Sequence, residues 1–258
     1  MIFLKLGGSL ITDKRGVEVA RTDVIQRLAQ EIAEAYRSTP DLKLLLGHGS
    51  GSFGHRAAEQ FGTHQGARNR QDWLGFCEVG AAANRLHQIV LDALRIEGLP
   101  AISFPPSSMV TTTEGKISAY ITDPIRMSLE NDLLPVVYGD VSLDTTHGAS
   151  IVSTEQVLAH LAKKIHPHRI LLAGKAAGIQ TESGEFLEEF HSQDLDRIQF
   201  HQPEGADVTG GMESKVQQAL IMATSFPEME ILIFSAETTG ILAEVLCGGS
   251  AGTHVIAS

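Results

Sequence analysis

Cysteine is nearly absent from this chain of 258 residues, which contains only Cys77 and Cys247. Two cysteines exclude a disulfide-rich scaffold, and we expect both to be reduced thiols in the core of a cytoplasmic protein. Long hydrophobic runs are missing as well. No stretch reaches the roughly 18 apolar residues of a membrane span, and the N-terminal sequence MIFLKLGGS lacks the apolar segment of a signal peptide. The sequence therefore predicts a soluble protein without a membrane partner.

Positive charge is also scarce. The chain has 20 lysines and arginines against 31 aspartates and glutamates, which gives a formal net charge of −11 at pH 7. Because nucleic-acid binding needs a basic surface, we expect no nucleic-acid partner. An acidic protein binds phosphates only through local donors, so the few lysines beside glycine-rich loops become informative.

The signatures of several enzyme classes are missing too. The chain has no G-x-x-x-x-G-K-[ST] sequence of the P-loop enzymes and no H-R-D and D-F-G pair of protein kinases. Although it has 11 histidines, no helical segment shows the H-x-x-x-H spacing of a zinc site. We therefore expect no metal ion held by the protein's own side chains.

Short apolar runs alternate with longer helical patterns along the whole chain. The apolar runs predict strands at 2–6, 42–47, 101–104, 134–138, 168–174, 230–235 and 253–257. The helical patterns predict helices at 22–38, 71–97, 122–130, 153–165, 212–226 and 238–246. Nearly continuous apolar strands are typical of a sheet covered on both faces, so the pattern predicts an α/β fold with a mainly parallel sheet. Without a repeat or linker, residues 1–258 form one domain of two lobes, and residues 181–190 form a small hairpin.

Two glycine-rich loops follow the first two predicted strands. In KLGGSLITDK, Lys5 and Lys14 bracket a turn whose backbone N–H groups can approach an anion closely. In GHGSGSFGH, the spacing of Gly49, Gly51 and Gly54 matches a dinucleotide-binding motif. We reject that interpretation because the loop does not follow the first strand and no suitable acidic residue comes after it. The alternatives are a phosphate cradle with His55 at a helix start, or simple turns with solvated lysines and a capping histidine.

Two further segments are candidates. Asp140 follows a predicted strand and can order the site by bonding a lysine or a backbone amide, whereas Asp144 is expected to be structural. In ADVTGGMESK, two glycines lead into a helix that carries Lys215, and a helix N-terminus of this kind binds anions. The alternative is an exposed lysine after an ordinary glycine-containing loop.

These four segments, in this order, resemble the amino-acid kinase superfamily, and within it the isopentenyl phosphate kinases. The most discriminating part is the run from Gly51 to His55, since kinases of amino acids, carbamate and UMP have other residues at the histidine. The resemblance implies a three-layer αβα sandwich, with an acceptor lobe at about 1–167 and a nucleotide lobe at about 168–258. It also implies a cytoplasmic homodimer. Its expected reaction converts isopentenyl phosphate, an isoprenoid monophosphate, to the diphosphate with ATP and Mg²⁺, for isoprenoid biosynthesis by an alternative mevalonate route.

The resemblance also implies roles for individual residues. The catalytic set is Lys5, Lys14, His55 and Lys215. The acceptor would be bound by Ser50, Gly51, Gly54, His55, Gly139 and Asp140. The nucleotide would be bound by Lys5, Gly7, Gly8, Ser9, Gly51, Gly174, Lys175, Asp207, Thr209, Gly210, Gly211 and Lys215. The Mg²⁺ ion would be held mainly by the ATP phosphates.

The sequence departs from its relatives at two places. Residues 153–156 read STEQ where relatives commonly have SGDD, and residues 173–178 read AGKAAG where they commonly have a TDxDG run. We expect both changes to remove acidic residues near the nucleotide, and the STEQ segment to cap a helix.

Other functions stay open on the sequence alone. They are a phosphonate kinase of the fosfomycin type, a nucleotide-binding sensor or storage protein of the same fold, and, less favoured, an amino-acid kinase. An isoprenoid tail also needs an apolar slot. Trp73, Phe76, Cys77 and Val79 are candidates to line it, although each serves equally well as a core residue.

Overall fold

The structure, a computed structural model, describes residues 1–13, 15–181, 183–198 and 211–257. Within these residues, a central sheet of eight strands has the order β10-β12-β11-β9-β1-β2-β6-β3. Its strands are β1 (Ile2–Leu6), β2 (Leu44–His48), β3 (Ala101–Ser103), β6 (Leu134–Tyr138), β9 (Arg169–Gly174), β10 (Glu189–Phe190), β11 (Glu230–Ser235) and β12 (Thr253–Val255). Every neighbouring pair is parallel except β11 and β12. The predicted, mainly parallel sheet is therefore confirmed.

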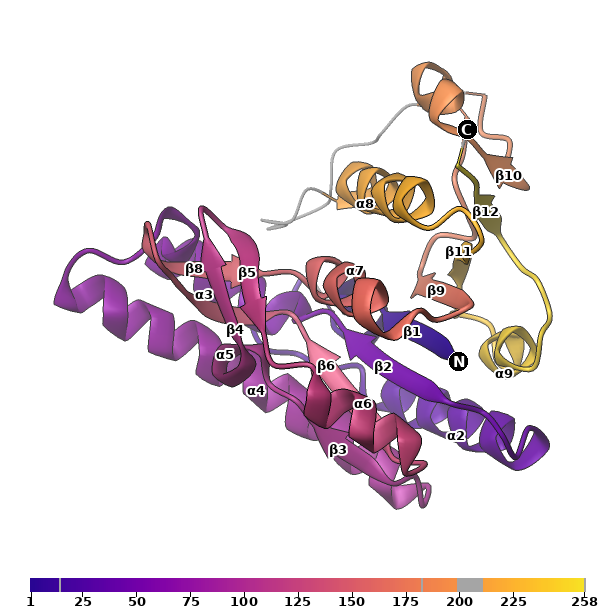
Figure 1. The fold of residues 1–258 in the computed structure, drawn as a ribbon, viewed down its shortest axis with the longest axis horizontal. Coiled ribbons are helices and arrows are strands. Elements are labelled where there is room, and N and C mark those ends of the chain that lie inside the picture. Colours follow the sequence, from indigo (N-terminus) through magenta and orange to yellow (C-terminus); the bar gives the residue numbers. More distant parts are fainter. Residues whose placement is uncertain (14, 182, 199–210, 258) are drawn as a thin grey trace.

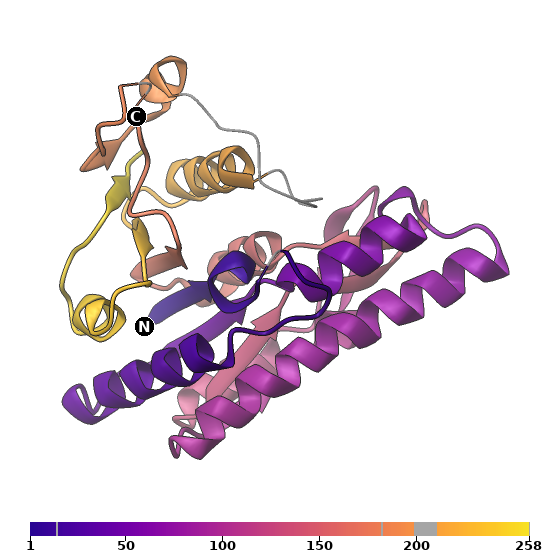
Figure 2. The same cartoon turned by 180° about the vertical axis from the view of Figure 1, so that it is seen from behind.

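Helices cover both faces of this sheet (Figure 1). One face carries α2 (Thr22–Ser38), α4 (Arg70–Ile96) and α9 (Ile241–Leu246), and the other carries α6 (Asp123–Glu130), α7 (Thr154–Ile165) and α8 (Gly211–Ser225). Strand β1 shows why: Leu4 packs with the first set and Phe3 with the second. Figure 2 shows α2 and α4 side by side on their face. Alternate burial on two faces produces the three layers that the fold class requires.

A second, smaller sheet lies at one end of the molecule and was not predicted (Figure 1). Its order is β5-β4-β7-β8, with bounds β4 (Val110–Thr113), β5 (Lys116–Tyr120), β7 (Asp140–Asp144) and β8 (Gly148–Val152). Val141 of β7 packs against Val79 of α4 and Ala58 of α3 (Gly51–Phe61). The remaining short elements are α1 (Gly8–Ile11), α5 (Pro106–Met109), η1 (Thr63–Gln65) and η2 (Ser192–Arg197).

The cysteines correct one expectation. Cys77 and Cys247 are free of disulfides, but both are exposed. Cys77 lies on the outer side of α4 and Cys247 follows the last residue of α9, so neither faces the sheet. The prediction that they are core thiols was therefore wrong.

Two smaller features complete the fold. The hairpin predicted at 181–190 is present, with Gln180 bridged to Phe186 and Gly184 in the left-handed region at its turn, φ 85°. No helix among the described residues is long and apolar enough to cross a membrane. Strands β9 and β1 are hydrogen-bonded neighbours in one sheet, so the division into lobes near residue 167 stays a prediction.

Candidate active site

Two glycine loops touch at the carboxyl ends of the neighbouring strands β1 and β2. A Cβ atom on Gly8 would lie 2.6 Å from the backbone nitrogen of Gly51, and one on Gly49 would lie 2.8 Å from that of Gly8. Gly51 has φ +51°, in the region that favours glycine. The amide of Gly49 also donates to the carbonyl of Leu6 at 2.9 Å. The glycines are therefore needed because two backbones approach each other more closely than side chains allow.

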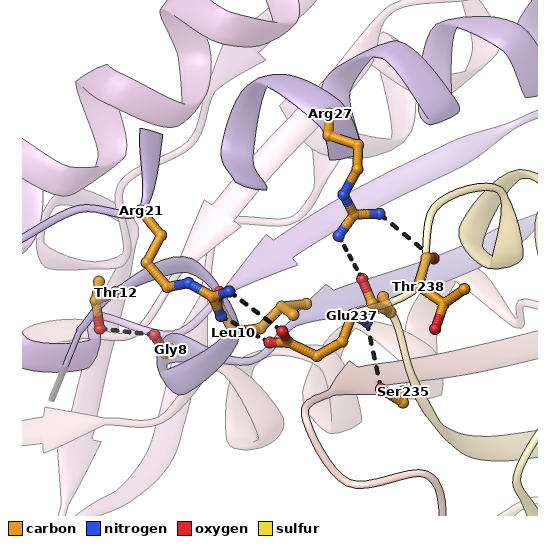
Figure 3. Close-up of polar contacts among 9 residues, drawn as sticks. Gly8, Leu10, Thr12, Arg21, Arg27, Ser235, Glu237 and Thr238 are labelled. Carbon is orange, nitrogen blue, oxygen red and sulfur yellow. Dashed lines mark hydrogen bonds and ion pairs between the residues drawn. The ribbon is translucent and has the colours of Figure 1, made fainter. Parts of the chain in front are cut away.

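Thr12 joins the two loops. Its hydroxyl donates to the carbonyl of Gly8 at 2.7 Å, a contact visible in Figure 3, and accepts from the amide of Ser52 at 3.0 Å. Thr12 is fully buried. It therefore connects α1 to the first turn of α3. Sequence reasoning missed this residue, because nothing in the segment LITDK distinguishes it from an ordinary turn threonine.

A first pocket opens over these loops. It is lined by Lys5, Gly8, Ser9, Gly49, Ser50, Gly51, Gly54, His55, Ala58, Val79, Ala83, Gly139, Asp140, Ile151, Val152, Ser153, Thr154 and Glu155. All the residues predicted to bind the acceptor are among them. One part of the wall is polar, whereas Ala58, Val79, Ala83 and Ile151 give another part an apolar surface. This "acceptor pocket" can hold a molecule with an anionic head and an apolar tail.

His55 lies further into its helix than the sequence predicted. Helix α3 begins at Gly51, which makes His55 its fifth residue rather than a residue at the start. It is half-buried and lines the acceptor pocket. The ring is therefore brought to the pocket by the second turn of α3, above the loop that ends β2.

A second pocket adjoins the first on the other side of β1. It is lined by Lys5, Gly7, Ser9, Glu155, Leu172, Ala173, Gly174, Lys175, Ala176, Ile233 and Phe234. We call it the "donor pocket". Of the residues predicted to bind the nucleotide, this pocket contains Lys5, Gly7, Ser9, Gly174 and Lys175. Two others, Gly8 and Gly51, line only the acceptor pocket.

The two pockets share Lys5, Ser9 and Glu155. The ammonium group of Lys5 forms an ion pair with the carboxylate of Glu155, and the two side chains are only 7% and 12% exposed. Although the STEQ segment has fewer acidic residues than the SGDD of its relatives, it still supplies one carboxylate at the junction of the two pockets. The carboxylate is present one residue into α7, where it holds the central lysine between the pockets.

The capping interpretation of the same segment is confirmed. Ser153 precedes α7, its hydroxyl accepts from the amide of Gln156 at 3.1 Å, and the side chain of Gln156 accepts from the amide of Ser153 at 2.8 Å. This reciprocal pair fixes the first turn of the helix. The cap thereby positions Glu155, which lies between its two members.

Asp140 and Asp144 behave as the sequence predicted. Asp140 accepts hydrogen bonds from the amides of Ser107 at 3.0 Å and Val141 at 2.8 Å. Burial nevertheless raises the pKa of the Asp140 carboxyl above its ordinary value. Asp144 accepts from three backbone amides, those of Gly115, Thr146 and His147, and so has a structural role in the turn after β7.

One ion pair and hydrogen bonds to backbone carbonyls tie the loop after β11 to α2 (Figure 3). The guanidinium group of Arg21 contacts both carboxylate oxygens of Glu237, at 2.6 and 3.2 Å, and also donates to the carbonyl of Leu10 at 2.9 Å. The hydrogen bond from Arg21 lowers the pKa of Glu237. Arg27 donates to the carbonyl of Ala236 at 2.6 Å. These contacts hold α1 and α2 against the strand end beside the donor pocket.

Several predicted residues are not tested by these pockets. Lys14, Asp207, Thr209 and Gly210 lie outside the described residues. Gly211 begins α8 and Lys215 lies four residues further along that helix, where the structure gives the course of the backbone. Their roles stay predictions.

The fold and the paired pockets can now be compared with known proteins. Residues 1–235 match the model of the amino acid kinase family, and the chain belongs to that family. More narrowly, it is similar to the isopentenyl phosphate kinase of Methanothermobacter thermautotrophicus, with 34% identity over 96% of each chain. The isopentenyl phosphate kinase of Methanocaldococcus jannaschii is 30% identical, covering 84% of this chain and 85% of its own. A solved structure of isopentenyl phosphate kinase has a TM-score of 0.85 at 32% identity over 99% of both chains.

Proposed function

We propose that this protein transfers the γ-phosphoryl group of ATP to isopentenyl phosphate, forming isopentenyl diphosphate and ADP. The observation that carries this proposal is the pair of adjoining pockets that share Lys5, Ser9 and Glu155, one of them with His55 and an apolar wall. Similarity to isopentenyl phosphate kinases over nearly the whole chain supports it, and favours it over a phosphonate kinase or a nucleotide sensor.

The chemistry asks for positioning and charge neutralisation rather than a general base. An oxygen of the acceptor phosphate attacks the γ-phosphorus, the bond from that phosphorus to the β–γ bridging oxygen breaks, and ADP leaves with the electron pair. The attacking oxygen is already anionic near neutral pH, since the second phosphate pKa is about 6. Lys5, at the junction of the pockets, would neutralise the moving group. Lys14 and Lys215 join it in our proposal on the strength of the sequence.

His55 would bind the acceptor phosphate by donating a ring N–H to one of its oxygens. The backbone at Gly51 would face the path of the phosphoryl group, and Gly139 and Asp140 would complete the pocket around the acceptor. On the donor side, Gly7 would let backbone amides approach the ATP phosphates, and Lys175 would add a cation. Gly8, which lines the acceptor pocket, would do the same from the neighbouring loop. Each group would oppose the repulsion between two anions.

The apolar wall would accept the isoprenoid tail. Of the four candidates named from the sequence, only Val79 lines the acceptor pocket in the described structure. Phe76 packs against the small core at Ala58, Val79 and Val141, and Trp73 is 37% exposed. Ala83, one helical turn beyond Val79, continues the same surface of α4.

A Mg²⁺ ion would be held mainly by the phosphates of ATP, where it would neutralise charge on the transferring group. The carboxylate of Glu155 is of the oxygen type that Mg²⁺ prefers, and it reaches the donor pocket while paired with Lys5. Among the described residues that line the donor pocket, Glu155 has the one carboxylate, and it would help to hold the metal there. We further propose that the protein works as a cytoplasmic homodimer, with the acceptor held by the lobe at 1–167 and the nucleotide by the lobe at 168–258.

Phosphorus NMR of the purified protein with ATP and Mg²⁺ tests the function. Isopentenyl phosphate, fosfomycin, a set of longer alkyl monophosphates and a sample without acceptor would be compared. We expect new diphosphate resonances and ADP with isopentenyl phosphate at the highest rate. Faster turnover of fosfomycin would favour the phosphonate kinase, and ADP formation independent of any acceptor would contradict the proposed reaction.

A further inference from the structure

A row of three polar side chains lies behind the acceptor loop and has no part in the reaction described above. His48 is the last residue of β2, His87 lies on α4 and Ser103 ends β3. His48 Nε2 is 2.9 Å from His87 Nδ1, and His87 Nε2 is 2.7 Å from the hydroxyl of Ser103. Both histidines are 0% exposed. At the other end of the row, His48 Nδ1 is 3.2 Å from the carbonyl oxygen of Gly49.

The hydrogen-bond partners determine where each proton lies. A carbonyl oxygen can only accept, so Nδ1 of His48 carries the proton that bonds Gly49. In a neutral ring Nε2 of His48 is then an acceptor, and Nδ1 of His87 must be the donor to it. Nε2 of His87 is left to accept from the hydroxyl of Ser103. Both rings therefore adopt the Nδ1–H tautomer, and every ring nitrogen has a partner.

The surroundings keep both rings uncharged. Burial lowers the pKa of His48 to about 4 and lowers that of His87 further below its ordinary value. After burial, the neighbouring His48 and then the charge of Arg95 on α4 also lower the pKa of His87. From β6, Tyr138 stacks on His87 at 4.1 Å between ring centroids, and its hydroxyl lies beside the carboxyl of Asp140 on β7.

From α7, the neutral hydroxyl of Thr154 reaches the main chain of His48. It donates to the carbonyl of His48 at 2.7 Å, and the amide of Gly139 donates to the same oxygen at 3.1 Å. The main chain at His48 is therefore fixed by the residue that follows β6 and by α7, while its ring is fixed from α4. The next carbonyl along the chain, that of Gly49, depends on the His48 ring.

We propose that His48 and His87 are positioning residues: as a neutral, directional relay they hold the carbonyl of Gly49 and thereby fix the acceptor loop against Gly8. This role rests on the proposed function, because it assumes that the loop binds the acceptor phosphate. Gly49 lies where the two glycine loops touch, so closely that a Cβ atom on it would lie 2.8 Å from the backbone nitrogen of Gly8. A rotation of the Gly49 carbonyl would turn the peptide that leads to Ser50 and Gly51 and misalign acceptor and donor.

A pair of substitutions at His48 separates this role from simple core packing. In His48→Asn the side-chain amide replaces Nδ1 and can still donate to Gly49, whereas in His48→Gln the amide replaces Nε2 and cannot. We expect kcat to fall about tenfold or more in the Gln variant, with the KM for ATP unchanged within about twofold. The Asn variant should recover most of that loss. Gln88→Ala, on the exposed side of α4, is the control for a change in the helix that carries His87.

Two further measurements distinguish a loss of the hydrogen bond to Gly49 from a loss of folding. Thermal unfolding at pH 7 shows whether the two His48 variants are equally folded. Long-range proton–nitrogen NMR of ¹⁵N-histidine-labelled wild-type protein reports the tautomers directly. We expect two rings with the proton on Nδ1, and His87→Leu should shift the resonances of His48 and lower kcat while leaving the KM for ATP unchanged.

The outcomes separate the two claims. Wild-type protein that forms no isopentenyl diphosphate would overturn the proposed function, and this role with it. Active wild-type protein with equal kcat in the His48→Asn and His48→Gln variants would overturn the relay alone. An Nε2–H tautomer at His48 would also overturn it, because that ring could not donate to Gly49.

Discussion

The two pockets are built differently, although they share one lysine. The acceptor side is held by buried contacts, among them Thr12 between the loops and the histidine row behind Gly49. The donor side is bordered by the ion pair of Arg21 and Glu237, whose side chains are 25% and 37% exposed. Buried hydrogen bonds fix a single geometry, whereas exposed ion pairs contribute little free energy. The acceptor side is therefore the pre-organised half of the site.

The largest loss of activity is expected for substitutions of Lys5, where the acceptor and donor pockets meet. Lys5→Met should lower kcat by about 100- to 1,000-fold, because it removes the cation shared by the two pockets. Lys5→Arg should be intermediate, since it keeps the charge but not the compact ammonium group. Steady-state kinetics at saturating substrates would measure this.

Loss of Lys5 also removes a charge-neutralising ion pair from Glu155, which lies in a mostly buried position. The double variant Lys5→Met with Glu155→Gln controls for that mispairing. If the double variant regained wild-type kcat, Lys5 would serve only to neutralise Glu155, and its proposed contact with the phosphoryl group would be wrong.

The second effect concerns the stability of the acceptor half. The lowered pKa of His48, about 4 in place of about 6.5, means that the folded state binds fewer protons than the unfolded state between these values. At about 1.4 kcal/mol per pKa unit, this contribution is about 3 kcal/mol. It is fully present above pH 6.5 and is lost as the pH falls toward 4.

Urea unfolding at several pH values would test this slope. The free energy of unfolding of the wild type should fall more steeply between pH 6.5 and 4.5 than that of His48→Asn. His64→Asn, at an exposed position, should keep the wild-type slope. Parallel curves for wild type and His48→Asn would show that His48 does not titrate differently in the two states.

The third effect is a loss of acceptor binding on substitution of His55. It should be confined to the acceptor and leave ATP binding unchanged. His55→Ala should lower kcat/KM for the acceptor by roughly 10- to 100-fold, as expected for losing a hydrogen bond to a charged group. Most of that change should be a raised acceptor KM, while the KM for ATP stays near its wild-type value. Initial rates with each substrate varied in turn would show this. An unchanged acceptor KM would remove His55 from the acceptor site.

The smallest effect on kinetics is expected for the ion pair of Arg21 and Glu237, which borders the donor pocket. Arg21→Ala and Glu237→Ala should each change the KM for ATP by less than about threefold, since an exposed ion pair contributes about 0.2–1 kcal/mol. A double-mutant cycle measured by unfolding should give a coupling energy in the same range. A coupling above about 2 kcal/mol would mean that the donor side is as firmly organised as the acceptor side, and the contrast between the halves would disappear.

The sequence predicted the central sheet well because its strands are short and uniformly apolar. Runs such as IFLKL and LPVVY have one physical explanation, burial on both faces, and both became strands with the predicted bounds. The smaller sheet was missed because its strands, among them VTTT and DVSLD, are rich in threonine, serine and aspartate. Their stability depends on pairing with one another, which no local pattern shows.

In the candidate site, the glycine and lysine positions could be predicted from the sequence because the signal for each lies in a short local segment. A glycine loop at the end of a strand is itself a signal, and all the acceptor residues predicted in this way line one pocket. Contacts between residues that are far apart in the sequence could not be predicted. His48 and His87 are 39 positions apart, Thr12 and Ser52 are 40 apart, and Lys5 and Glu155 are 150 apart. Only the folded chain brings such pairs together.

The parallel ladder between β1 and β2 has one more consequence. The two phosphate loops extend from strands paired residue by residue from Ile2 with Leu44 to Leu6 with His48. In the proposed reaction, the distance over which the phosphoryl group travels would thus be set by main-chain pairing at the centre of the protein. In the same proposal, the tail-facing surface on α4 and β8 lies outside this ladder, so evolution or engineering can reshape it for a bulkier alcohol while the span of the reaction stays constant.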